Sequence, residues 1–395
     1  MNVLRLALAH MRFHWKRTLL LAGCAIICFL LPLLIPQLVN RIQTELYRQS
    51  NLLPLIIGSR NCSPLDLTLH GLYLRNRDLP VIRYGVWQEM AEKYGDEILP
   101  IHARFIVADQ NHEFPIVGTH LDYFSQRALQ FQTGTAFGTL GDCVIGANVA
   151  EEMNVGLGDH VISSPESVVS LAAAYPVRLN IVGILSPTNS VEDDLILVDL
   201  KTAWIIENLG HGHQDVSQTN DPNLIMERTE QGTVASPAVS TYTEITAENL
   251  ASFHFHGDEA DFPITAVLVT SHDQRTLDLL SGKAQRSNQI QAVQSQNEVS
   301  KLLAVVFQVQ WLLLAVVLVV GVATILLFTL VIALSIQIRA DEMQTMFKLG
   351  ASRGFTWQLH AAEILSILLG SFLIASLSTA MILSNVSDRW VQWIL

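Results

Sequence analysis

Three stretches of the chain are long and continuously apolar, and each is bounded by charged residues. Thr18–Val39 holds 22 residues without a charge, Lys301 and Arg339 bracket another 37, and a third stretch carries Glu363 near its start. At about 1.5 Å per residue, about 20 helical residues cross a hydrocarbon core of about 30 Å. The pattern therefore predicts three transmembrane helices, within residues 1–40, 301–339 and 359–384.

Between the first two apolar stretches, hydrophobic and polar residues alternate over short runs, as is typical of a folded domain in water. Alternating patterns predict strands at 143–146, 160–162, 175–185 and 195–198. Residues 147–153 are expected to form a helix that ends before a Gly-rich turn at 156–159, and residues 278–300 a stalk helix that leads into the second span. The fold class predicted is a membrane α-helical protein with a large extracytoplasmic α+β domain over 41–300.

Basic residues flank the apolar stretches unevenly. Residues 1–17 contain four Lys or Arg and no acid, and the short loop at 340–358 is bounded and occupied by further bases. Because Lys and Arg are retained in the cytoplasm, we expect both of these segments inside, and the domain at 41–300 and the tail at 385–395 outside. A cleaved signal peptide is disfavoured because the first apolar run continues without a cleavage site.

The composition supports a membrane protein and excludes one kind of partner. Half of the 395 residues are apolar and 15% are charged, and the net charge of −12 excludes nucleic acid as a general partner, since phosphate contacts need a basic face. The segment 207–261 contains ten acids and one base, Arg228, together with frequent Gly, Ser, Thr and Pro. Part of this acidic segment is therefore predicted to be a mobile loop.

Two histidine pairs in the acidic segment are the candidates for metal chemistry: His211 with His213, and His254 with His256. Imidazoles beside carboxylates can bind Zn²⁺, so these four form a candidate zinc site, with solvated loop histidines as the alternative. Cys62 and Cys143 either form one disulfide or remain separate thiols. The sequence has no nucleophile elbow, no H-E-x-x-H motif and no phosphate-binding loop, so no enzyme activity is predicted for this chain.

The loop after the second apolar stretch carries a specific motif. From Ile338 to Arg353 it runs Ile-Arg-Ala-Asp-Glu-Met-Gln-Thr-Met-Phe-Lys-Leu-Gly-Ala-Ser-Arg, and Glu363 follows early in an apolar helix. This run resembles the cytoplasmic loop of MacB/FtsX-type permeases, the type VII ABC transporter family. The segments Val144–Ala150, Val155–Asp159 and Val182–Leu185 look like the outer domain of the same permeases.

The resemblance implies a non-catalytic permease subunit in a bacterial inner membrane that couples ATP hydrolysis to movement of the outer domain. The coupling residues would be Glu342, Met343, Met346, Phe347, Leu349, Gly350, Ala351 and Ser352. Glu363 would make a polar contact to this loop or to a partner helix, with an acid that reaches the lipid headgroups as the alternative. The implied partners are an ABC ATPase carrying ATP and Mg²⁺, a second permease subunit, an outer accessory protein and membrane lipid. Zinc supply is one theme associated with such permeases.

One departure from this family and one alternative function stay open. Most members have a fourth transmembrane helix, whereas only about a dozen residues follow the third apolar stretch here. The chain is therefore expected to be either a three-span variant or one that stops early. The alternative function is a membrane sensor or scaffold with an outer ligand-binding domain and no nucleotide-driven transport.

Overall fold

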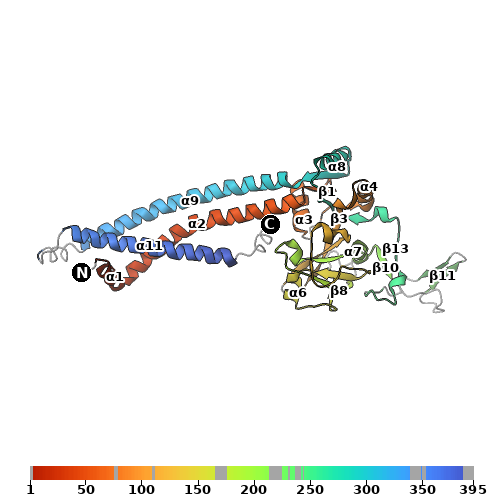
Figure 1. Ribbon diagram of the computed structural model, residues 1–395, viewed down its shortest axis with the longest axis horizontal. Helices are drawn as coiled ribbons and strands as arrows, with labels where there is room; N and C mark the ends of the chain where they lie inside the picture. Colours follow the sequence, from red (N-terminus) through yellow and green to blue (C-terminus); the bar gives the residue numbers. More distant parts are fainter. Residues whose placement is uncertain are drawn as a thin grey trace. The chain divides into compact units, whose positions relative to one another are not determined.

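The computed structural model divides the chain into two compact units (Figure 1). The first comprises Met1–Leu46 and Lys301–Val391, and the second contains Tyr47–Ser300. The residues that the structure describes are 3–74, 79–108, 112–164, 176–212, 225–229, 232–235, 242, 244–338, 348 and 353–385.

Long helices make up the first unit: α1 (Val3–Phe13), α2 (Trp15–Leu52), α9 (Ser295–Ile338) and α11 (Arg353–Asn385). Three segments of the described residues are long and apolar enough to span a membrane, at Trp15–Leu52, Ser295–Ala323 and Ala361–Ser384. Helix α2 continues well past Val39, where the apolar run ends. Residues 40–53 include good helix formers and contain neither proline nor glycine, and the next proline is Pro54.

Helices α2 and α11 pack side by side through three described contacts. Near its start, α2 accepts a hydrogen bond at the Ala22 carbonyl from Ser371, at 3.3 Å. The rings of Phe29 and Phe372 meet edge to face at 5.6 Å, and Arg41 donates to the carbonyl oxygen of Leu383 at 2.7 Å. Because the residue numbers increase together along both helices, the helices run parallel.

A ten-stranded sheet forms the centre of the second unit, in the order β16-β1-β15-β3-β4-β9-β6-β8-β5, with β7 paired to β8. Parallel pairing joins β4 to β9 and β6 to β8, and the other pairs are antiparallel. Its strands are β1 (Leu55–Ser59), β3 (Ile98–Ala108), β4 (Glu113–Thr119), β5 (Phe131–Gly134), β6 (Asp142–Ile145), β7 (His160–Ile162), β8 (Arg178–Leu185), β9 (Ile196–Asp199), β15 (Ala266–Val269) and β16 (Ile290–Gln294).

Smaller ribbons and short helices surround this sheet. The two-stranded ribbons pair β2 (Ile82–Arg83) with β14 (Pro263–Ile264), β10 (Gly210–Gly212) with β13 (Phe253–Phe255), and β11 (Ile225–Thr229) with β12 (Gly232–Ala235). The helices are α3 (Pro64–Tyr73), α4 (Tyr84–Tyr94), α5 (Asp122–Gln126), α6 (Ala147–Met153), α7 (Leu200–Ile206) and α8 (Gln274–Arg286). Short 3₁₀ turns are η1 (Gly95–Glu97), η3 (Val191–Asp194), η4 (Leu250–Ser252) and η5 (Glu259–Asp261).

Strand β3 belongs to both halves of the large sheet. Its first part, Ile98–Ile101, pairs with β15, and the residues from His102 onward pair with β4 across an irregularity in register. Each half has its own hydrophobic core, and α7 contributes to both: Trp204 to one and Ile205 to the other. One strand and one helix therefore join the two cores into a single unit.

The local elements expected between residues 143 and 200 are present as β6, α6, β7, β8 and β9. The described residues of the acidic segment include strands β10, β11, β12 and β13, while the mobile loop expected in part of this segment stays a prediction.

The prediction of one stalk helix over 278–300 is wrong for the middle of that range. The structure has the end of α8, then strand β16, and only then the start of α9. Residues Ile290 and Val293 lie buried where β16 pairs with β1, and that pairing decides the local structure in place of helix propensity.

Candidate functional site

The predicted coupling loop lies almost wholly outside the described residues. This applies to each coupling residue named above, from Glu342 to Ser352, while Lys348 within the loop is described and exposed. The flanking elements are described: α9 ends at Ile338 and α11 begins at Arg353. The ATPase-coupling role of the loop therefore stays a prediction from the sequence.

Glu363 lies in the third apolar helix, about three turns after its start at Arg353. Glu363 is buried, with 6% of the residue exposed. Its role, either a polar contact to the loop or a partner helix or an acid that reaches the lipid headgroups, stays a prediction from the sequence.

The C-terminal end of α2 and the N-terminal end of α9 meet at one edge of the ten-stranded sheet. This sheet is called the outer sheet, and the unit that contains it, Tyr47–Ser300, is called the outer unit. Strands β1 and β16, which follow α2 and precede α9, are neighbours with Leu55 opposite Gln294. The amide of Ser295 donates to the carbonyl of Pro54 at 3.1 Å, and the side-chain amide of Gln296 donates to Asn51. The last turn of α2 and the first turn of α9 are thus hydrogen-bonded to each other at adjacent strands of the same sheet.

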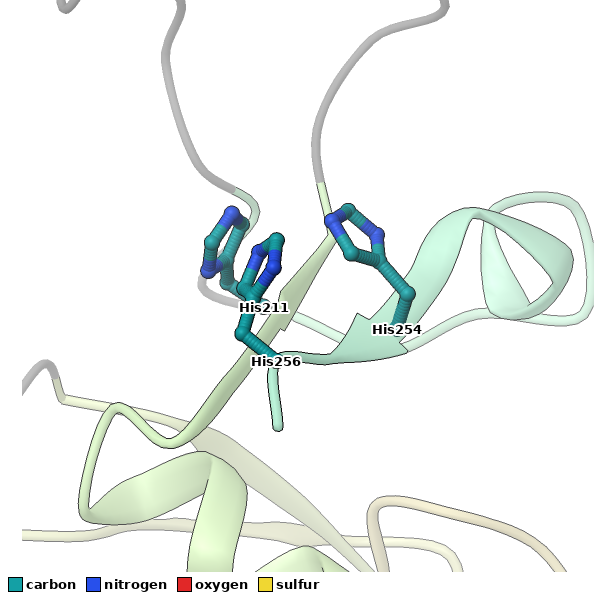
Figure 2. Close-up of side chains that lie close together, drawn as sticks. All are labelled: His211, His254 and His256. Carbon is teal, nitrogen blue, oxygen red and sulfur yellow. The ribbon is translucent and has the colours of Figure 1, made fainter. Parts of the chain in front are cut away.

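Three histidines from the acidic segment converge on one face of the β10–β13 ribbon (Figure 2). His211 lies directly opposite His254 in the antiparallel register, and His256 follows two residues later. His256 lies just beyond the end of β13 at Phe255, and its ring lies beside those of His211 and His254 (Figure 2). The ring centroids are 4.8–5.0 Å apart, and one ligand nitrogen from each ring lies within 4.8 Å of the others.

The opposite face of this ribbon anchors it to the cores of the outer unit. Phe253 and Phe255 alternate with the histidines and pack against the hydrophobic clusters. A Cβ atom added at Gly210 would come within 2.5 Å of the Phe255 ring, and one at Gly212 within 2.7 Å of Phe253. Glycine on both sides of His211 therefore lets the phenylalanine rings cover β10, which fixes the histidine face outward.

The carboxylates of the acidic segment take other partners. Lys201 binds Glu259 at 3.4 Å, Arg178 binds Glu244 at 3.2 Å, and Arg83 binds Asp261. The zinc site expected from the sequence comprised the four histidines His211, His213, His254 and His256. Within the described part of the chain, the metal-competent group contains His211, His254 and His256 and no carboxylate, and His213 lies outside that part.

Glu207 belongs to a further ion pair away from these histidines. It lies 2.8 Å from Arg104 and 3.0 Å from the buried His102. Burial opposes the ionisation of Glu207, but the neighbouring His102 and Arg104 outweigh it and hold its pKa below the ordinary value.

A second candidate site is a pocket of about 500 Å³ in the outer unit, which the sequence did not reveal. It is lined by Tyr84, His120, Leu121, Asp122, Asp199, Leu200, Lys201, Trp204 and Glu259. The Tyr84 hydroxyl and the His120 Nε2 atom are 3.1 Å apart, and Trp87 stacks on Tyr84. Aromatic walls with three carboxylates and one lysine suit a small ligand that carries positive charge.

Burial also perturbs the titratable groups of this pocket. It lowers the pKa of His120 below its ordinary value, although Asp199 and two other carboxylates act in the opposite direction. Burial raises the pKa of Tyr84, with Glu259 and Asp199 adding to the effect. Both side chains are therefore held neutral near pH 7, which suits hydrogen bonding to a ligand.

The outer unit shows likeness to three solved domains. The periplasmic region of MacB from Actinobacillus actinomycetemcomitans aligns at 11% identity and a TM-score of 0.32, over 63% of this chain and 91% of that one. The extracellular domain of the ABC-type transporter YknZ from Gram-positive bacteria gives 13% and 0.30, over 55% and 96%. A domain assigned to a permease protein from Porphyromonas gingivalis gives 12% and 0.28, over 62% and 89%.

No protein-family profile and no curated relative matches the chain. The first of these domains belongs to MacB, the second to a noncanonic ABC-type transporter and the third to a permease protein. At these identities and TM-scores, the function has to be argued from the residues of the chain itself.

Proposed function

We propose that this chain is a permease subunit of an ABC system, one that passes work from a separate cytoplasmic ATPase to its outer domain. The observation that carries the proposal is the continuity of two helices. Helices α2 and α9 each run without a break from an apolar segment into the outer sheet, where β1 follows one and β16 precedes the other.

The lengths of these helices support mechanical coupling. At about 1.5 Å per residue, the 38 residues of α2 extend about 57 Å and the 44 residues of α9 about 66 Å, against a hydrocarbon core of about 30 Å. Each helix therefore has more residues than one crossing of the hydrocarbon core needs, and within α2 two of them, Pro32 and Pro36, lack the backbone amide that would donate within the helix. A displacement of the cytoplasmic end of α9 would be delivered to β16 and, across the shared ladder, to β1.

The loop that follows α9 is the proposed point of attachment for the ATPase. With helical spacing, Met343, Met346 and Phe347 share one face, and Gly350 is suited to end the helix. Such an apolar edge in the cytoplasm is expected to bind a groove on a partner. Since the sequence contains no phosphate-binding loop, nucleotide chemistry is assigned to that partner.

Co-purification tests this proposal directly. The full chain is isolated in detergent from its native host, and the proteins that accompany it are identified by mass spectrometry. We expect a Walker-type ATPase, and we expect the Met346→Asp and Phe347→Asp variants to lose the ATPase or its stimulation by the chain. The matched control is Thr345→Asp, which adds the same charge on the opposite side of the expected helix.

The outcome that contradicts coupling is an ATPase whose binding and turnover are the same with all three variants. The second candidate, an outer ligand sensor or scaffold, would then be favoured, and the pocket beside Tyr84 and His120 is the observation that supports it. In the coupled case we further propose a bacterial inner-membrane location with the N-terminus inside, and a dimer with a second permease subunit. The substrate would be bound by the outer domain or by an accessory protein.

A further inference from the structure

We infer that His211, His254 and His256 together bind one divalent transition-metal ion of the zinc class, with a fourth coordination position left open. Three neutral nitrogen donors are the ligand set of open zinc sites, in which water or an exchangeable ligand completes a tetrahedron. The inference concerns the outer unit alone, and it holds whether or not the chain couples to an ATPase.

The distances among the three rings are close to those of a bound site. A tetrahedral zinc ion with bonds of about 2.0–2.1 Å needs its nitrogens about 3.3–3.4 Å apart, whereas the three nitrogens here lie within 4.8 Å of one another. Each ligand nitrogen therefore has to move by up to about 0.8 Å. Rotation about the side-chain torsions can supply such a shift without a change in the paired backbone of β10 and β13.

The hydrogen bonding of His254 also suits a ligand. Its Nδ1 atom lies 3.0 Å from the carbonyl oxygen of Ser252. A carbonyl can only accept, so Nδ1 carries the proton and donates in this contact, and Nε2 is the nitrogen of His254 that would bind a metal. A hydrogen bond from the second ring nitrogen to a backbone carbonyl is the usual outer-shell support of a metal-binding histidine.

The donor set selects the kind of ion. Imidazole nitrogens suit Zn²⁺, Cu²⁺, Ni²⁺ and Co²⁺, whereas Ca²⁺ and Mg²⁺ require oxygen ligands that this group does not provide. Three uncharged ligands leave the double positive charge of the ion uncompensated, so the open position favours an anionic or water-derived ligand. Since His256 is exposed and the other two rings are half-buried, the ion can exchange with solvent.

The test uses the full chain purified in detergent without a polyhistidine tag and stripped with a chelator. Isothermal titration with Zn²⁺ is expected to give one ion per chain at micromolar or lower concentration. Co²⁺ is expected to produce the visible absorption of a four-coordinate site, and Ca²⁺ and Mg²⁺ are expected not to compete.

The variants His211→Ala and His254→Ala are expected to weaken zinc binding by at least about tenfold each, since even outer-shell partners contribute about 10–100-fold. The matched control is His160→Ala, which removes an exposed histidine from β7 and should leave the affinity unchanged. The thermal unfolding midpoint of each variant without metal verifies its fold, and His254→Gln gives a second variant of similar size.

Two results would overturn the inference: no zinc binding by the unmodified chain, or equal affinity in the double variant His211→Ala/His254→Ala. Neither measurement involves an ATPase. If the chain binds zinc but no ATPase, only the coupling proposal is refuted. If it binds an ATPase but no zinc, only the metal site is refuted.

Discussion

The buried ion pair between Arg127 and Glu192 offers a sharp test of the outer fold. The Arg127 side chain is 6% exposed and that of Glu192 is 1% exposed, and their closest atoms are 2.6 Å apart. Tyr123 donates a further hydrogen bond to the same carboxylate oxygen at 3.2 Å, and Ser190 donates to the other oxygen. Arg127→Leu removes the cation and leaves a buried carboxylate whose remaining hydrogen-bond donors are uncharged.

The expected cost is large because an uncompensated buried charge remains. Breaking one side of a buried pair costs about 3–5 kcal/mol. At about 2–4 °C per kcal/mol for a domain of this size, the unfolding midpoint should fall by about 6–20 °C. The Arg127→Leu/Glu192→Met double variant removes both charges, so it should recover most of the loss.

The pH dependence gives a second measurement of the same pair. Burial opposes the ionisation of Glu192, but the Arg127 guanidinium and the hydrogen bonds outweigh it and hold the pKa of Glu192 below its ordinary value. A lowered pKa stabilises the fold above the unfolded pKa of about 4.3, and that contribution is lost as the pH falls through the folded pKa. In Arg127→Leu, burial alone should raise the pKa of Glu192, so the deficit relative to the unmodified chain should shrink as the pH is lowered.

The assay is thermal unfolding of the full chain in detergent, followed by tryptophan fluorescence from pH 4 to pH 7.5. Lys283→Leu is the control, because it breaks a 3.0 Å ion pair with Glu89 whose side chains are exposed, a pair of the kind worth about 0–1 kcal/mol. A midpoint for Arg127→Leu that matches the control at every pH would refute the reasoning.

Two further outcomes are expected. In Gly146→Ala the added Cβ would clash with the backbone carbonyls of Glu192 and Asp193, so the variant should destabilise the outer unit by about 1–3 kcal/mol. The control is Gly138→Ala, whose Cβ meets no atom within 4 Å and should leave the unfolding midpoint unchanged. Equal midpoints for the two variants would contradict the predicted clash. Cys62 and Cys143 are buried and form no disulfide, and burial raises the pKa of both thiols, so neither should react with maleimide in the native chain. Both should react after denaturation without reductant, and peptide mass analysis that finds them joined would contradict this.

Local signals predicted part of the outer unit from the sequence. The strand, helix and turn at 143–159 could be recognised because the hydrophobic period changes at each boundary between them. In the structure, Gly146 precedes α6, and Asn154, which has a left-handed backbone, ends that helix. The three long apolar helices were predictable for a similar reason, since length and continuous apolarity depend only on neighbouring residues.

Features that depend on distant pairing were not predictable in the same way. Strand β16 is a strand because it pairs with β1, more than 200 residues earlier, and its own composition suggested a helix. The histidines were recognised as two adjacent pairs, but the register that brings His211 opposite His254 follows from the ribbon alone. The pocket beside His120 draws its side chains from several separate elements, so no sequence motif marks it.

The shared strand β3 has a consequence for how the outer unit melts. Its 11 residues extend about 36 Å, and their backbone groups complete the hydrogen-bond ladder of β15 at one end and of β4 at the other. Loss of order in one half would expose unpaired amides and carbonyls in the other. The two cores therefore form a single cooperative folding unit, and neither is expected to persist as a half-folded remnant that could aggregate through an open sheet edge.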